Sequence, residues 1–191
     1  SLINSNRFRD YNGEYVDAIG TDQQGGVDCE PDVATTQGNL DAVFYGTECS
    51  RNAGKGLSNS LSNSHVRAFD IIANANALGG VQNAGGSFHL DGFFGADYVS
   101  TVVQGVVAST VDAIVTSFKN MTFQNVVLND SGKACVFVKG DGTKIQHVQD
   151  IYAHDCQAAL LYGSGAVMAD GVRATKFDTV TGPAVTINMA N

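Results

Sequence analysis

Short runs of alternating apolar and polar residues recur along the whole chain, and turns of small polar residues separate them. One kind of run follows turns such as Asn52-Ala-Gly-Lys and Asn83-Ala-Gly-Gly, where Asn and Gly supply the left-handed backbone of a tight corner. We expect strands of this kind at residues 25–29, 56–60, 87–91, 110–114, 134–138, 158–162 and 183–187. Their first residues lie 31, 31, 23, 24, 24 and 25 positions apart, which indicates a structural repeat.

Two further kinds of alternating run fill the space between these strands. One kind comprises residues 121–126, 151–156 and 172–177, and the other includes 144–148 and 166–169. Three short strands at about 3.3 Å per residue, with their corners, close one coil of about 22 to 25 residues. Because such a coil buries its apolar residues only by stacking, the pattern predicts an all-β fold, a parallel β-solenoid of about seven coils.

An α/β fold is the competing interpretation, with helices at residues 68–78 and 101–115. The second segment is dense in Val and Thr, which favour strands, and neither has a capping signal followed by good helix formers. We therefore expect residues 1–191 to form one solenoid domain with longer loops within 31–55 and 61–86. Both ends resemble unfinished coils, so we expect the chain to be a section of a longer helix.

Composition and charge limit the function. The chain is 43% hydrophobic, and a formal net charge of -8 argues against nucleic-acid binding, which needs clustered cations. No apolar run approaches the roughly 20 residues of a membrane-spanning helix, so no membrane insertion is expected.

Four cysteines are present, but they form no Cys-x-x-Cys pair and have no histidine at zinc-like spacing. Neither a metal site nor a cofactor is therefore expected. The favoured state is four buried free thiols: Cys29, Cys49, Cys135 and Cys156.

Two acidic residues on the first strand are candidates for chemistry. Side chains alternate between the faces of a strand, so Val27 and Cys29 face the core while Asp28 and Glu30 project outward. Their Cα atoms are then roughly 6.6 Å apart. A solvated sheet face is the alternative explanation for both carboxylates.

Residues 87–91, aligned as the equivalent strand two coils further on, add to this outer patch. The alignment places His89 and Asp91 in the same outward columns, about 9.6 Å along the axis. The predicted catalytic neighbourhood is Asp28, Glu30, His89 and Asp91, and the serines of the intervening coil, Ser58 and Ser60, are predicted to contact the substrate.

Residues that follow residue 91 extend the predicted groove. An aromatic pair can stack on sugar faces, and a carboxylate and a phenol follow it. These further substrate-binding candidates are Phe93, Phe94, Asp97 and Tyr98, and the long loops add Asp41 and Asp70. The other histidines lack partners at a useful spacing and are not assigned to the site: His65, His147 and His154.

The rungs of the predicted solenoid resemble a known group of proteins. Phe123-Gln-Asn-Val, followed by Gly132-Lys-Ala-Cys-Val, resembles the rungs of right-handed parallel β-helix proteins, including pectate-lyase-like enzymes and bacteriophage tailspike depolymerases. Gly25-Gly-Val-Asp-Cys-Glu-Pro is similar to a strand that recurs in such carbohydrate-active proteins. The resemblance implies a right-handed parallel β-helix, a homotrimer, and a location on a virion tail or otherwise outside the cell.

The resemblance and the outer patch together suggest an enzyme that cleaves bacterial capsular or O-antigen polysaccharide. Glycosidic hydrolysis by paired carboxylates is preferred, since inverting enzymes hold them about 6.5–9.5 Å apart and crowding raises one pKa. A lyase with His89 as base is the alternative, although the patch lacks an arginine to neutralise the substrate carboxylate. A non-catalytic shaft or adhesin is the third hypothesis.

Overall fold

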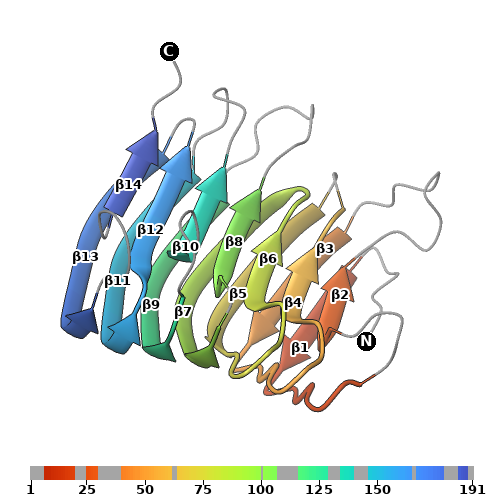
Figure 1. Cartoon of the computed structure of the whole chain (residues 1–191). Helices are drawn as coiled ribbons and strands as arrows, with labels where there is room; N and C mark the ends of the chain where they lie inside the picture. The colour runs from red at the N-terminus through yellow and green to blue at the C-terminus, as the bar shows by residue number, and fades with distance from the viewer. Residues whose placement is uncertain are drawn as a thin grey trace.

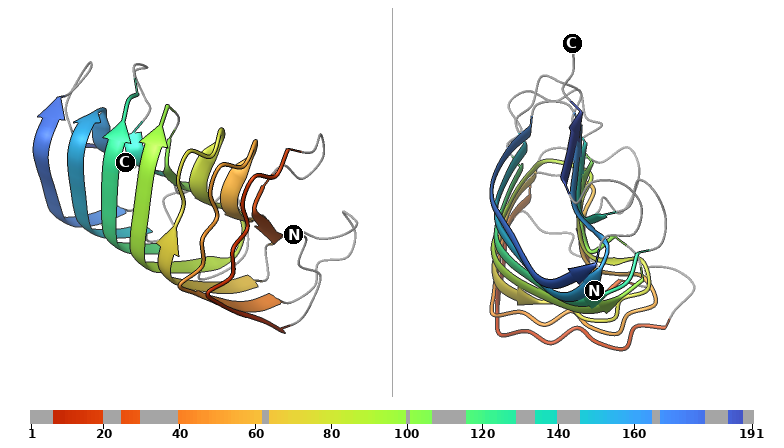
Figure 2. Two further views of the ribbon diagram at one scale, coloured as in Figure 1. Left: turned by 90° about the horizontal axis from the view of Figure 1, so that it is seen from below. Right: turned by 60° about the vertical axis from the view of Figure 1, so that its left-hand side comes forward.

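The chain winds as a coil of parallel strands that lie in two sheets, seen from three directions in Figures 1 and 2. This computed structural model describes residues 7–19, 25–29, 40–61, 64–99, 101–106, 116–128, 134–139, 146–164, 167–178 and 185–188. Each sheet has seven strands, and the chain alternates between the sheets from one strand to the next. We call them the odd-numbered sheet and the even-numbered sheet.

The two sheets differ in the length of their strands. The odd-numbered sheet comprises β1 (Arg7–Tyr11), β3 (Leu40–Tyr45), β5 (Ser64–Ile72), β7 (Ser87–Tyr98), β9 (Thr116–Val126), β11 (Gln146–Gln157) and β13 (Val167–Asp178). The even-numbered sheet comprises β2 (Val27–Cys29), β4 (Lys55–Asn59), β6 (Gly79–Asn83), β8 (Val103–Val106), β10 (Ala134–Lys139), β12 (Ala159–Ser164) and β14 (Val185–Asn188).

The predicted all-β parallel β-helix is confirmed. Every pairing between neighbouring strands of both sheets is parallel, and each strand pairs with its equivalent one coil away. The segment 68–78, which the alternative made helical, contains the end of β5 and the corner after it. Within the described ranges the chain has no helix that is long and apolar enough to cross a membrane.

The division of the chain into coils differs from the predicted one. Residues 87–91, predicted to follow 56–60 in one sheet, lie in β7 of the odd-numbered sheet, whereas the true partner of β4 is β6. The sequence of β6, Gly-Gly-Val-Gln-Asn, has one large apolar residue and gives a weak strand signal. The predicted loops within 31–55 and 61–86 therefore contain strands, and residues 110–114 lie outside the described part of the chain.

In the coils of β11 and β13, two of the predicted strands merge into one long strand. Residues 144–148 and 151–156 were expected to be separate, but β11 spans Gln146–Gln157 and bends at Asp150, whose φ is 53°. The bend explains why the sequence alternation is interrupted there, because a left-handed residue turns the strand without ending it.

A ladder of apolar side chains fills the space between the sheets. In the even-numbered sheet Val27, Leu57, Val81, Val103, Val136 and Leu161 stack in register and are at most 1% exposed. Phe88 and Phe118 of the odd-numbered sheet meet with ring centroids 6.2 Å apart. The four cysteines belong to this interior and are free thiols, as predicted.

Two columns of left-handed residues form the corners of the odd-numbered sheet. The first contains Asn12, Gly46, Asp70, Gly92, Asn120, Asp150 and Gly171, and the second, five residues later in each coil, contains Asp17, Arg51, Ala75, Asp97, Asn125 and Asp155. Asn, Asp and Gly tolerate this conformation. At Gly92 a Cβ atom would lie 2.5 Å from the Asp70 carboxylate of the preceding coil, so a larger residue there would have to displace that side chain.

Ala75 has the left-handed conformation, at a φ of 53°, without glycine's freedom or the local hydrogen bonds of an Asx side chain. We expect Ala75→Gly to raise the free energy of unfolding by up to about 1 kcal/mol, because relief of strain exceeds the added entropy of the unfolded chain. The measurement is urea unfolding. The control is Ala77→Gly, an equally exposed alanine without a positive φ, which should lose about 0.4–1 kcal/mol. Equal effects at both sites would contradict the assignment of strain.

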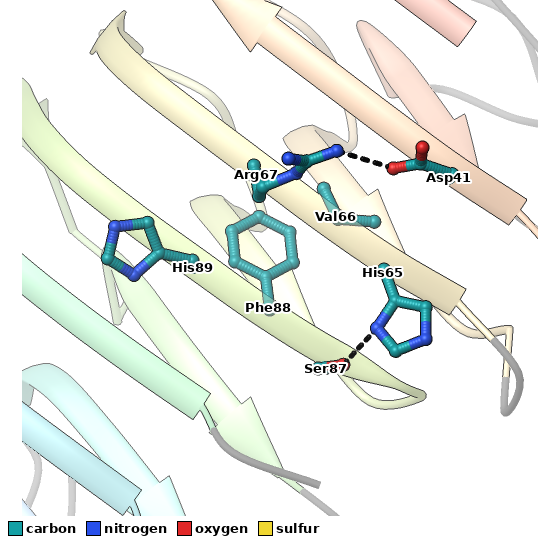
Figure 3. A pocket seen from close by; sticks show the side chains of 7 residues that line it. All are labelled: Asp41, His65, Val66, Arg67, Ser87, Phe88 and His89. Atoms are coloured by element: carbon teal, nitrogen blue, oxygen red, sulfur yellow. Dashed lines mark hydrogen bonds and ion pairs between the residues drawn. The ribbon is translucent and has the colours of Figure 1, made fainter. Parts of the chain in front are cut away.

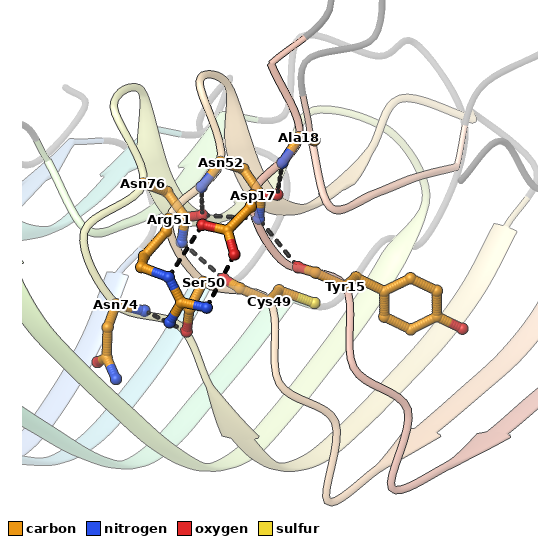
Figure 4. Close-up of polar contacts among 9 residues, drawn as sticks. All are labelled: Tyr15, Asp17, Ala18, Cys49, Ser50, Arg51, Asn52, Asn74 and Asn76. Atoms are coloured by element: carbon orange, nitrogen blue, oxygen red, sulfur yellow. Dashed lines mark hydrogen bonds and ion pairs between the residues drawn. The ribbon is translucent and has the colours of Figure 1, made fainter.

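Buried asparagines link the corners of successive coils (Figure 4). The Oδ1 atom of Asn76 accepts hydrogen bonds from the backbone N–H of Asn52 at 2.9 Å and from its side-chain amide at 2.8 Å. The side-chain amide of Asn76 donates to the carbonyl of Cys49 at 2.7 Å and to the Tyr98 hydroxyl at 2.9 Å. Asn76, only 3% exposed, therefore satisfies backbone groups that the corner removes from sheet pairing.

Replacement of this asparagine should destabilise the solenoid. Asn76→Ala leaves the Asn52 N–H and the Cys49 carbonyl buried without partners, so we expect a loss of about 2–4 kcal/mol in the free energy of unfolding. Gln124→Ala, on the exposed face of β9, is the control and should stay within about 0.5 kcal/mol. Similar urea midpoints for the two variants would show that the hydrogen bonds of Asn76 between coils do not contribute to stability.

Candidate functional site

An open groove of about 530 Å³ lies on the outer face of the odd-numbered sheet (Figure 3). It crosses β3, β5 and β7, whose parallel register brings side chains far apart in the sequence into neighbouring columns. Residues that line it are Asp41, His65, Val66, Arg67, Ser87, Phe88 and His89. Val66 and Phe88 belong to the core, so the polar residues among those named form the outer surface of the groove.

One column of the groove contains an aspartate, a histidine and a serine on consecutive strands. Asp41 pairs in register with His65, and His65 pairs with Ser87. The Ser87 hydroxyl lies 2.8 Å from Nδ1 of His65, and Figure 3 shows these side chains pointing toward one another. Among the described residues the Asp41 carboxylate contacts two arginines instead of His65, so the column does not form a connected catalytic triad.

Arg9 and Arg67 hold the Asp41 carboxylate between them. Nη2 of Arg9 lies 2.8 Å from Oδ2, and Nη2 of Arg67 lies 2.7 Å from Oδ1. These hydrogen bonds, from Arg9 first and then Arg67, lower the pKa of Asp41. Two cations against one anion leave the cluster with a net positive charge, and the Arg67 side chain remains 48% exposed.

His89 is the register partner of Arg67 in the adjacent column. Its ring meets Phe69 edge-on at 5.7 Å, and its Nε2 atom lies 4.0 Å from a carboxylate oxygen of Asp91. Partial burial lowers the pKa of His89, and Lys119 lowers it further, against the opposing effect of Asp91. The imidazole is therefore neutral at neutral pH and able to accept a proton.

A polar group with no protein partner lies next to His89. Ser117 follows His89 in the same outward column and is 7% exposed. Its hydroxyl has no hydrogen-bond partner in the part of the chain that the structure describes. A buried hydroxyl without a partner costs free energy unless water satisfies it, and Ser117 is not among the residues that line the groove.

The predicted catalytic neighbourhood is not assembled as the alignment required. Asp28 lies on the even-numbered sheet and His89 and Asp91 on the odd-numbered sheet, because 87–91 was aligned with strands of the wrong sheet. Glu30 lies outside the described residues. Asp28 does adjoin the predicted Ser58, whose hydroxyl donates to its carboxylate at 2.6 Å.

The remaining predicted substrate-binding residues are divided between core and surface. Phe93 and Tyr98 are buried, and Tyr98 bonds to Asn76, so the prediction that they contact a substrate is wrong. Ser60 is exposed after β4, and Phe94 is half-buried on the outer face of β7. Asp97 is an exposed corner residue that accepts a 2.6 Å hydrogen bond from Asn125.

Sequence reasoning missed His65 and Arg67 because segment 61–86 was interpreted as a loop. The alternation in His-Val-Arg-Ala-Phe was the available signal, since it places His65, Arg67 and Phe69 on one face of a strand. Arg67 is the cation that the predicted patch lacked.

No three His, Cys, Asp or Glu side chains in the described ranges are grouped so that they could hold a metal ion.

Comparison with protein-family models, curated proteins and solved structures gives no significant match. The resemblance to tailspike and pectate-lyase-like proteins stays a prediction. The functional proposal therefore depends on the residues of the groove.

Proposed function

We propose that the chain binds a uronate-containing polysaccharide in the groove of the odd-numbered sheet and cleaves it by β-elimination. The observation that carries the proposal is the parallel register of β5 and β7, which puts Arg67 and the neutral base His89 at neighbouring positions of one groove, although the guanidinium is paired with Asp41 in this structure. Elimination needs both groups, because removal of a proton next to a carboxylate is easier once the carboxylate charge is neutralised.

The proposed reaction balances without a cofactor. A ring nitrogen of His89 takes the proton from the sugar carbon that bears the carboxylate, and the electron pair of that C–H bond forms a carbon–carbon double bond. The glycosidic C–O bond at the neighbouring carbon breaks, and its oxygen takes a proton from water in the open groove. The hydroxide that remains takes the proton from His89, which regenerates the neutral base. Arg67 stabilises the negative charge that develops on the carboxylate. The products are an unsaturated uronide and a fragment with a hydroxyl end.

The positions of the carboxylates favour elimination over hydrolysis. Asp28 is on the other sheet from Asp91, and Asp41 is held by Arg9 and Arg67. Hydrolysis by Asp28 with Glu30 stays a prediction, as do the trimer and the virion location. An assay for both reducing ends and unsaturated products distinguishes the reactions, because only elimination gives both.

Removal of the base should abolish cleavage. We expect His89→Gln to lower the rate of unsaturated-product formation by roughly 10²–10⁴-fold, the usual contribution of a general base. The matched control is His147→Gln, a histidine in the same outward column two strands further on. Ultraviolet absorbance of the unsaturated uronide measures the rate. Release of reducing ends without ultraviolet absorbance, lost in Asp28→Asn and unaffected by His89→Gln, would support hydrolysis instead.

Cleavage should depend on pH through His89. A base acts when unprotonated, so kcat/KM should rise with pH and level off once the imidazole is neutral. Since burial lowers the pKa of His89, the midpoint should lie below the ordinary value of about 6.5. Lys119→Gln removes a charge that lowers this pKa, so it should move the midpoint to higher pH. A midpoint that Lys119→Gln leaves unchanged would argue against His89 as the titrating group.

A further inference from the structure

A row of aromatic side chains on the outer face of the odd-numbered sheet leads to the groove. Tyr11 of β1, Tyr45 of β3 and Phe69 of β5 are partners in the parallel register. Tyr11 is 67% exposed and Tyr45 is 48% exposed. We call these three residues the aromatic row.

The aromatic row ends beside the proposed base. Phe69 contacts the ring of His89, and the next residue in the column of the row is Asp91. Tyr45 and Phe69 have ring centroids 6.4 Å apart and an interplanar angle of 41°, so they are tilted instead of stacked face to face. Because Tyr11 and Tyr45 are also exposed, ring surface remains open to a molecule that lies along the axis of the solenoid.

Arginine side chains lie beside the aromatic row. Arg9 precedes Tyr11 by two residues and Arg67 precedes Phe69 by two residues, so both side chains project from the same face as the rings. A surface that combines open aromatic rings with arginines suits sugar rings that carry carboxylates, since the rings cover apolar sugar faces and the arginines pair with the acid groups.

The spacing of the row also suits a polymer. Neighbouring strands of a sheet are about 4.8 Å apart, which is comparable with the advance of a polysaccharide chain per sugar. Successive sugars can therefore lie over successive coils without stretching either partner.

We infer that the aromatic row is a set of binding subsites that hold the acidic polysaccharide along the solenoid axis, on one side of the bond cleaved at His89. This inference rests on the proposed function and adds the direction of the polymer and the residues that hold its uncleaved part. The competing account is that the three rings only stabilise the sheet through cross-strand contacts.

Binding by the full chain carrying His89→Gln tests the inference, since that background prevents consumption of the polymer. The probes are polygalacturonate, alginate and glucuronate-containing bacterial capsular polysaccharides. We expect Tyr45→Ala to raise the Kd roughly tenfold, a typical effect of truncating an aromatic anchor. Tyr45→Phe should bind within about twofold of the parent, because it keeps the ring.

Tyr152→Ala is the matched control, a tyrosine 40% exposed on the outer face of β11, beyond the bend at Asp150 and outside the row. It should bind like the parent. Urea unfolding of each variant measures any loss of stability separately. With His89 intact, Tyr45→Ala should raise KM for the polymer and leave kcat nearly unchanged. A loss of folded protein alone would lower the apparent kcat and leave KM unchanged.

The outcomes separate this inference from the proposed function. Equal Kd values for Tyr45→Ala and Tyr152→Ala, in a chain that forms unsaturated products, would overturn the aromatic row and leave elimination standing. A tenfold loss on Tyr45→Ala in a chain that forms no unsaturated product would support the row and overturn elimination. Failure of the parent to bind any polymer of the panel would overturn both.

Discussion

Parallel pairing of each strand with its equivalent one coil away is the constraint on which the rest of the structure depends. In every coil the chain must return to the same register, so residues at equivalent positions stack in columns along the axis. The columns place valine over leucine in the core and asparagine over asparagine at the corners. They also bring Asp41, Arg67 and His89, residues from three separate strands, to one groove.

The corners make that register possible, and they restrict the sequence more narrowly than the strands do. Each coil turns at left-handed residues, and the side chain of one corner lies against the next, as the contact between Asp70 and the position of Gly92 shows. A strand position accepts many apolar residues, whereas each residue of the first corner column is Gly, Asn or Asp and the second column also contains Arg51 and Ala75. The long strands remain continuous through these bends, which lets the outer face of the odd-numbered sheet run unbroken beside the groove.

The fold could be predicted from the sequence because it depends on a property that every coil repeats. The site could not be predicted, because it depends on which strand pairs with which. One misassigned strand changes which residues are expected to stack together in a column. The alternation in Ser87–Asp91 is stronger than that in Gly79–Asn83, yet Gly79–Asn83 is the partner of β4. His89 was identified as a base from its residue type and outward position, while its partner Arg67 required knowledge of the register.

Charge adds a further condition on any acidic ligand. The chain carries a formal net charge of -8, so a polyanion is repelled by the molecule as a whole and can be attracted only where cations are concentrated. Arg9 and Arg67 provide that concentration, since their shared carboxylate offsets only one of the two charges. Because screening at physiological ionic strength limits exposed charges to about 8 Å, a ligand near Arg9 and Arg67 interacts mainly with this pair and with the nearby acids Asp41 and Asp91, the second of which lies 4.0 Å from His89. The remaining acids disfavour binding elsewhere on the surface, so the overall charge sharpens the preference for the groove.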